Sequence, residues 1–82
     1  MTKYDEKTRE IQFDPHDWKG MSELRARADE FKVPCVGKNE EGESVWISIN
    51  HDNITVQTFQ KNGWIRTNVY WDDYNVEETY DK

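Results

Sequence analysis

Residues 45–71, VWISINHDNITVQTFQKNGWIRTNVYW, limit the possible folds more than any other part of this chain. Apolar and polar side chains alternate along them, which is the period of a β-strand. Turn signals interrupt the alternation at His51-Asp52-Asn53 and at Asn62-Gly63, and further turn signals stand at residues 39–42 and 72–75. The pattern predicts an antiparallel meander.

Asn62-Gly63 is the strongest turn signal because both central residues of a type I′ turn need positive φ. A two-residue turn there predicts Phe59 opposite Arg66. A second turn centred on Asp52-Asn53 predicts Ile49 opposite Val56. Together the two turns predict one aliphatic core face, made of Val45, Ile47, Ile49, Ile54, Val56, Ile65, Val69 and Trp71.

The other face of the predicted sheet is polar except for a cluster at one end. In the predicted register Trp46, Phe59 and Arg66 form a row across three strands, with Trp64 diagonal to it and Tyr70 on the same face. Trp, Tyr and Arg are enriched at interface hot spots, so one interpretation is a contact surface for a partner or for a second copy.

A structural interpretation of the same cluster stays open. Cross-strand aromatic pairs and a cation–π contact stabilise thin sheets by themselves. The N-terminal Ile11 and Phe13 could also cover the cluster if the sheet curls.

Residues 14–31 predict a helix over about residues 15–31. Asp14 can cap it, Pro15 suits the first helical position, and Asp17 favours the helix dipole. One apolar stripe follows at helical spacing: Trp18, Met21, Leu24, Ala28 and Phe31. Because Gly20 costs about 1 kcal/mol inside a helix, a short turn followed by a helix from Glu23 is the alternative.

The predicted fold class is therefore α+β, with one main helix packed on a four- to five-stranded antiparallel meander sheet. Residues 76–80 would add one edge strand and residues 33–37 another, where Pro34 is tolerated. An SH3-like curled barrel with an N-terminal helix is the alternative. At 82 residues we expect a single domain, residues 1–82, with residues 1–10 flexible.

The net charge of −6 is unevenly placed, since residues 36–82 hold nine Asp and Glu against four Lys and Arg. Such a field repels phosphate backbones and acidic membrane surfaces and attracts basic partners. We therefore expect a protein partner with a basic surface and no direct binding of nucleic acid or membrane.

The C-terminal segment concentrates this acidity in Asp72, Asp73, Glu77, Glu78 and Asp81. One interpretation is a solvated edge strand whose charges discourage aggregation. The other is a surface that docks on a basic partner in the way phosphates do. A calcium loop does not fit, because Glu78 stands where that loop needs glycine.

The sequence contains no arrangement of residues that specifies a catalytic chemistry. Cys35 is the only cysteine, which excludes an internal disulfide and a cysteine-based zinc site and fits a reducing cytoplasm, although its reactivity stays open. Asp14, His16, Asp17 and His51 are the only conceivable acid–base or metal set, and they lack ligand spacing. We expect no enzyme activity, no cofactor, no metal and a cytoplasmic location.

The residues together predict a small acidic, non-catalytic binding protein that occludes a surface of a macromolecular partner. Its most specific form is an inhibitor of a nucleic-acid-binding protein, and in size and charge the chain resembles phage- or mobile-element-type inhibitors. The alternatives are a homodimeric structural or adaptor protein using the aromatic face, and a small enzyme. The predicted partner-binding residues are Trp46, Phe59, Trp64, Arg66, Tyr70, Asp72, Asp73, Glu77 and Glu78.

Overall fold

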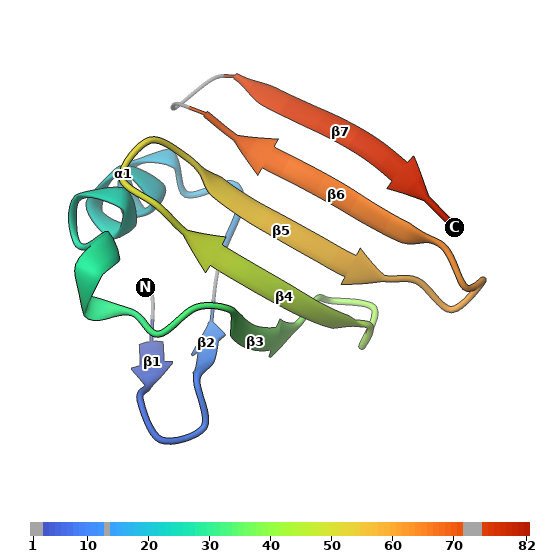
Figure 1. The fold of residues 1–82 in the computed structure, drawn as a ribbon, viewed down its shortest axis with the longest axis horizontal. Helices are drawn as coiled ribbons and strands as arrows, with labels where there is room; N and C mark the ends of the chain where they lie inside the picture. Colours follow the sequence, from blue (N-terminus) through green and yellow to red (C-terminus); the bar gives the residue numbers. More distant parts are fainter. Residues whose placement is uncertain (1–2, 13, 72–74) are drawn as a thin grey trace.

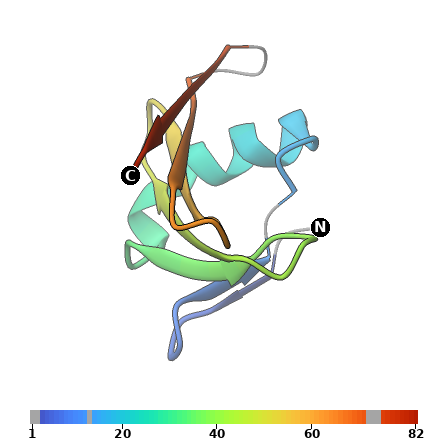
Figure 2. The same ribbon diagram turned by 90° about the vertical axis from the view of Figure 1, so that its right-hand side faces the viewer.

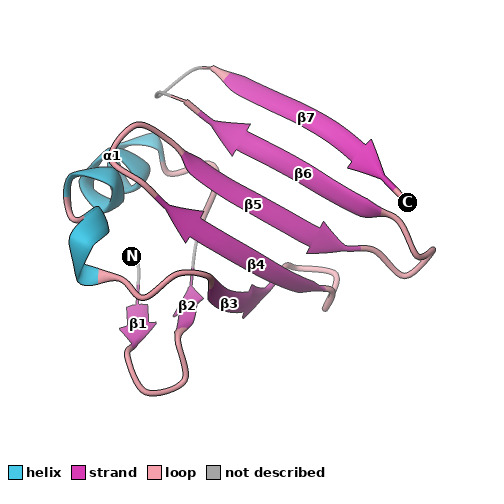
Figure 3. Cartoon of the chain, viewed as in Figure 1, coloured by secondary structure: helices cyan, strands magenta, loops and turns pink. Residues whose placement is uncertain are grey.

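The computed structural model describes residues 3–12, 14–71 and 75–82, and most of the regular secondary structure within them is strand (Figures 1 and 3). The strands are β1 (Lys3–Asp5), β2 (Glu10–Gln12), β3 (Cys35–Lys38), β4 (Ser44–Ile49), β5 (Ile54–Phe59), β6 (Ile65–Tyr70) and β7 (Val76–Asp81). One short helix, α1 (Trp18–Ala26), and a 3₁₀ turn, η1 (Ala28–Glu30), connect β2 to β3.

The seven described strands form one sheet in sequence order, from β1 to β7. β2 and β3 run parallel, with Glu10 opposite Val36, whereas the other neighbouring strands are antiparallel. Parallel strands need a long crossover connection, and the segment with α1 and η1 between β2 and β3 supplies it.

The predicted fold class is therefore wrong. Over the described residues, the structure is a seven-stranded mixed sheet with one short helix, not a main helix on a four- to five-stranded antiparallel sheet. The SH3-like barrel is also wrong, because among the described strands β1 and β7 are the two edges of an open sheet. Two additional strands, β1 and β2, are only three residues each, too short to show a period in the sequence.

The helix begins later and ends earlier than predicted. Asp17 caps it, since its Oδ1 accepts a hydrogen bond from the Gly20 N–H at 3.0 Å. Asp14 instead makes a turn ahead of the helix, where its Oδ1 accepts from the His16 N–H at 2.9 Å. The predicted apolar stripe is nevertheless correct: Met21 and Leu24 are buried on α1. Ala28 and Phe31 continue it beyond the helix.

The core lies between this stripe and one face of the sheet, on the side where α1 packs (Figure 2). We call this the helix side and the opposite one the outer face. The core contains Ile11, Met21, Leu24, Ala28, Phe31, Cys35, Val45, Ile47, Ile49, Ile54 and Val56. The predicted core face of β4 and β5 is thus confirmed.

The β4–β5 turn lies one residue earlier than predicted. The Asn50 N–H donates to the Asn53 carbonyl at 2.9 Å, so His51 and Asp52 are the loop residues. Ile49 consequently pairs with Ile54 rather than with Val56. A shift of two in the pairing keeps every side chain on its predicted face, because the side-chain period of a strand is two.

The β5–β6 loop has three residues instead of two, and this changes the faces of β6. The Gln60 N–H donates to the Trp64 carbonyl at 2.9 Å, and Gly63 has a φ of 88°. Phe59 therefore pairs with Ile65. The shift of one residue turns Arg66 and Tyr70 to the helix side and Ile65 and Val69 to the outer face, so the predicted register and the predicted faces of β6 are wrong.

The remaining strands differ from prediction in their places in the sheet. β3 follows Pro34 and lies between β2 and β4, so it is not the predicted edge strand. β7 is an edge strand, as expected for residues 76–80. Near the N-terminus, β1 and β2 form a hairpin, and the flexibility of residues 1–10 stays a prediction. Ile11 is buried in the core on the helix side, so it does not cover the outer face, and Phe13 lies outside the described residues.

Candidate functional site

The outer face carries two aromatic side chains in contact. Trp46 of β4 pairs with Gln57, and its ring meets the ring of Phe59, diagonal to it on β5. The ring centroids are 5.2 Å apart and the planes cross at 73°, an edge-to-face arrangement. Trp46 remains 47% exposed. The pair stabilises the sheet and still leaves much of the indole open to a partner.

Further apolar side chains share the outer face because of the β6 register. Ile65 lies opposite Phe59, and Val69 lies opposite Thr55. Beyond the end of β6, Trp71 is 49% exposed, and its Nε1 donates to Glu77 Oε2 at 3.3 Å. Within the described residues, α1 and η1 pack on the other side of the sheet (Figure 2).

The predicted cluster is therefore divided between the two sides of the sheet. Trp46 and Phe59 lie on the outer face as expected, but Arg66 lies opposite Thr58 on the helix side, and the predicted row with Arg66 is wrong. Tyr70 also faces the helix side and packs against the core, its ring centroid 6.2 Å from that of Trp18. Whether these residues bind a partner stays a prediction.

Trp64 lies at the end of the β5–β6 hairpin and is 39% exposed. Its backbone N–H donates to Asn62 Oδ1 at 3.0 Å, and this hydrogen bond stabilises the loop that ends at Gly63. Trp64 does not join the Trp46–Phe59 pair. It precedes Ile65, so the alternation that places Arg66 on the helix side also directs Trp64 away from the outer face.

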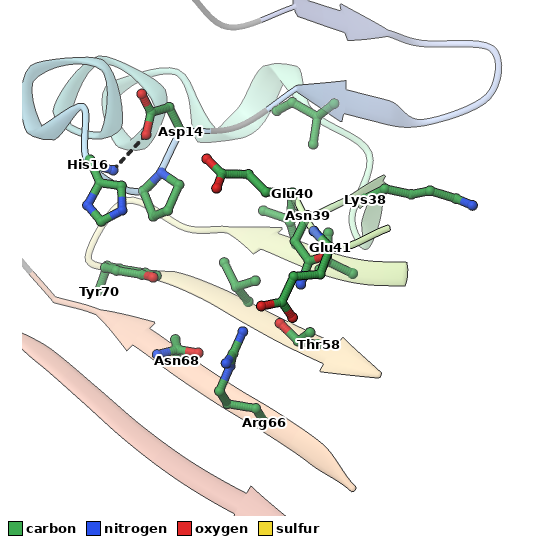
Figure 4. Close-up of a pocket in the computed structure, with 15 residues that line it drawn as sticks. Asp14, His16, Lys38, Asn39, Glu40, Glu41, Thr58, Arg66, Asn68 and Tyr70 are labelled. Atoms are coloured by element: carbon green, nitrogen blue, oxygen red, sulfur yellow. Dashed lines mark hydrogen bonds between the residues drawn. The ribbon is translucent and has the colours of Figure 1, made fainter. Parts of the chain in front are cut away.

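A cleft of about 480 Å³ lies on the helix side, beside the core (Figure 4). Val45, Ile47 and Val56 supply apolar lining, and Thr58, Arg66, Asn68 and Tyr70 supply polar groups. Residues 38–41 and 14–16 form its borders. Burial raises the pKa of Tyr70. Sequence reasoning missed this cleft because Arg66, Asn68 and Tyr70 reach the helix side only in the observed β6 register.

A buried carboxylate beside this cleft connects two loops. Glu43 accepts a hydrogen bond from Asn39 Nδ2 at 2.9 Å on Oε1 and one from the Lys61 N–H at 3.1 Å on Oε2. The hydrogen bond from Asn39 is the main cause of its lowered pKa, and the Lys61 N–H and the charge of Arg66 act in the same direction. Glu43 therefore has a structural role that the sequence did not indicate.

β7 carries the described part of the acidic segment and is exposed throughout. Glu78 Oε2 accepts a hydrogen bond from Asn68 Nδ2 at 3.2 Å, and the Tyr80 hydroxyl donates to Glu78 Oε1, a bond that raises the pKa of Tyr80. Glu77 lies on the other side of the strand, beside Trp71. Asp72 and Asp73 lie outside the described residues.

The candidate acid–base groups are separated or buried. Cys35 is 0% exposed, its thiol donates to the Lys32 carbonyl at 3.4 Å, and burial raises its pKa. His51 Nε2 lies 3.2 Å from Asp29 Oδ1. Among the residues that the structure describes, no three His, Cys, Asp or Glu side chains are grouped as a metal site would need.

Across the described residues, no helix has both the length and the apolar character required to cross a bilayer. No protein-family model, curated protein sequence or solved structure matches this chain. Any function must therefore be inferred from the surface of the chain itself.

Proposed function

We propose that this chain is a non-catalytic binding protein that covers a basic surface of a protein partner with the outer face of its sheet. The observation that carries the proposal is the exposure of two indoles, 47% for Trp46 and 49% for Trp71, on the side of the sheet away from α1. Exposed aromatic side chains on a rigid sheet are typical anchors of protein interfaces.

The charge supports a basic partner. The whole chain carries −6, and β7 adds two carboxylates along the outer face: Glu77 beside Trp71, and Asp81 opposite Ile65 at the other end of the strand. Charges at the rim of an interface mainly accelerate association, whereas buried aromatic residues mainly slow dissociation. In its most specific form, the partner is a nucleic-acid-binding protein whose phosphate-binding site is occluded. A cytoplasmic location fits the single free thiol of Cys35.

A first experiment compares kinetics with a partner captured on the immobilised protein. The double variant Trp46→Ala with Trp71→Ala should dissociate at least about tenfold faster, which corresponds to about 1.4 kcal/mol. The matched control is Thr55→Ala with Gln57→Ala, which changes polar positions of the same face and should leave dissociation within about twofold. Circular dichroism checks that both variants are folded.

The charge contribution is tested separately. Glu77→Gln with Asp81→Asn should slow association and reduce its dependence on salt between about 0.05 and 0.5 M. A folded double-tryptophan variant with unchanged dissociation would contradict the proposal. A stable dimer at micromolar concentration, detected by light scattering and abolished by the tryptophan substitutions, would instead support the homodimeric alternative.

A further inference from the structure

β7 presents a regular edge that is protected by its acidic side chains alone. It pairs with β6 in uninterrupted register over all six residues, from Tyr70 opposite Val76 to Ile65 opposite Asp81. Edges are usually protected by short strands, bulges, Pro or charged side chains. The other edge strand, β1, has three residues. β7 has six residues, VEETYD, with no Pro and no bulge, so its protection is the negative charge of Glu77, Glu78 and Asp81, which would not repel a basic strand.

The hydrogen-bond pattern identifies the free backbone groups of β7. The Trp71 N–H donates to the Asn75 carbonyl at 3.0 Å. Hydrogen-bonded and non-hydrogen-bonded pairs alternate along an antiparallel ladder, so Glu77, Thr79 and Asp81 direct their N–H and C=O groups toward β6. The backbone groups directed away from the sheet belong to Val76, Glu78 and Tyr80.

The β5–β6 hairpin independently gives the same assignment of the backbone groups that point toward and away from β6. Gln60 and Trp64 form a hydrogen-bonded pair, which assigns the backbone groups of Trp64 and of every second residue after it to β5. The intervening residues of β6, beginning with Ile65, must then bond to β7. Both ends of β6 therefore agree on which groups of β7 are free.

Charge determines which strand fits this edge. A second copy of β7 would place two sets of Glu77, Glu78 and Asp81 in one strand pair, and like charges across a strand pair are destabilising. A strand carrying Lys or Arg would pair with them favourably. Glu78 accepts hydrogen bonds from Asn68 Nδ2 and the Tyr80 hydroxyl and remains exposed, so its charge stays accessible to a basic strand.

We propose that β7 binds an extended, lysine- or arginine-rich segment of a protein partner as an additional strand of the sheet. This inference rests on the proposed function and specifies how the partner is bound. Backbone hydrogen bonds to Val76, Glu78 and Tyr80 would supply affinity, and the acidic side chains would select basic sequences, as in other cases of β-strand addition.

The first test uses a synthetic peptide, acetyl-Thr-Lys-Val-Lys-Val-Lys-Thr-amide, at about 1 mM. Amide hydrogen exchange followed by NMR should slow at least about threefold at Val76, Glu78 and Tyr80, with much smaller changes at Glu77 and Thr79, which already bond to β6. A control peptide with glycine in place of each valine keeps the charge but disfavours a strand. It should give less protection.

Three other results would overturn the inference. Equal protection by both peptides would indicate charge attraction without strand addition. Unchanged exchange at the three amides would mean that β7 binds no such segment. Protection that appears without peptide as the protein concentration rises would mean that a second copy occupies the edge.

A pair of variants separates this inference from the proposed function. Glu78→Pro removes one outward N–H without breaking a bond to β6, and Glu78→Gln removes the same charge but keeps the N–H. Peptide protection at Val76 and Tyr80 should be lost in folded Glu78→Pro and retained, at reduced strength, in Glu78→Gln. If a captured partner bound Glu78→Pro and Glu78→Gln equally but lost affinity on Trp46→Ala, the proposed function would stand and strand addition would be wrong.

Discussion

Phe59 of β5 lies directly opposite Ile65 of β6, and this pairing places Arg66 on the other side of the sheet from the Trp46–Phe59 ring pair. The outer face consequently gains the apolar Ile65 and loses the guanidinium. The helix side gains Arg66 beside the apolar lining of the cleft. One pairing thus separates an aromatic surface from a charged one.

This pairing depends on the conformation of Gly63. Its φ is 88°, and a Cβ added there would meet no atom within 4 Å, so any cost of substitution comes from the backbone alone. We expect Gly63→Val to lower the free energy of unfolding by about 1–2 kcal/mol. Gly63→Asn should cost clearly less, because Asn tolerates positive φ. Chemical denaturation measures both, and equal losses would contradict a backbone origin.

Replacing Gly20 by alanine is expected to lack the gain in stability that this change usually brings in a helix. Alanine inside a helix usually adds about 1 kcal/mol relative to glycine, but a Cβ at residue 20 would lie 2.4 Å from Asp17 Oδ2. The capping carboxylate would have to move, at a cost of about 1 kcal/mol. Gly20→Ala alone should therefore bring no gain in stability.

The same substitution in an Asp17→Ala background should stabilise the protein by about 1 kcal/mol, because the cap is already absent. A double-mutant cycle with thermal or chemical denaturation measures the coupling. Additive effects of the two changes would show that Asp17 does not cap α1 in solution.

The pKa of Glu43 predicts a pH dependence of stability. Its pKa is lowered from 4.5 in the folded protein, chiefly by the Asn39 hydrogen bond. The stabilisation is therefore fully present above pH 4.5 and is lost as the pH falls through the lower folded value. Glu43→Gln should be less stable than the wild type at pH 7 and should approach it in stability at acid pH. A constant difference from pH 7 to pH 3 would contradict this role.

Cys35 should be inert in the folded protein. Its side chain is 0% exposed and burial raises its pKa, so both access and the thiolate fraction are low. At pH 8, we expect a disulfide reagent to react with Cys35 at least about a hundredfold more slowly than with a cysteine at the exposed Ser44, introduced in a Cys35→Ala background. Denaturant should abolish the difference. Equal native rates would show that the core around Cys35 opens readily.

Several features of this fold follow from local sequence. The alternation in β4 and β5 predicted their core faces, and the spacing of Met21, Leu24 and Ala28 predicted the buried stripe, since a two- or 3.6-residue period is visible without knowledge of the partner elements. The predicted β4–β5 register was wrong by two residues, but the predicted faces were still correct because the side-chain period of a strand is two. These properties were determined by the sequence alone.

The faces of β6, and with them the candidate surface, were decided only by the tertiary structure. Asn62-Gly63 is compatible with a two- or a three-residue loop, because glycine adopts positive φ in both. The choice between them depends on which β6 side chains pack on the helix side: Tyr70 packs against the core there, near the Trp18 ring, while Val69 stays outside. Likewise the parallel β2–β3 pair joins residues that α1 separates in the chain, and no local period reports a contact across that distance.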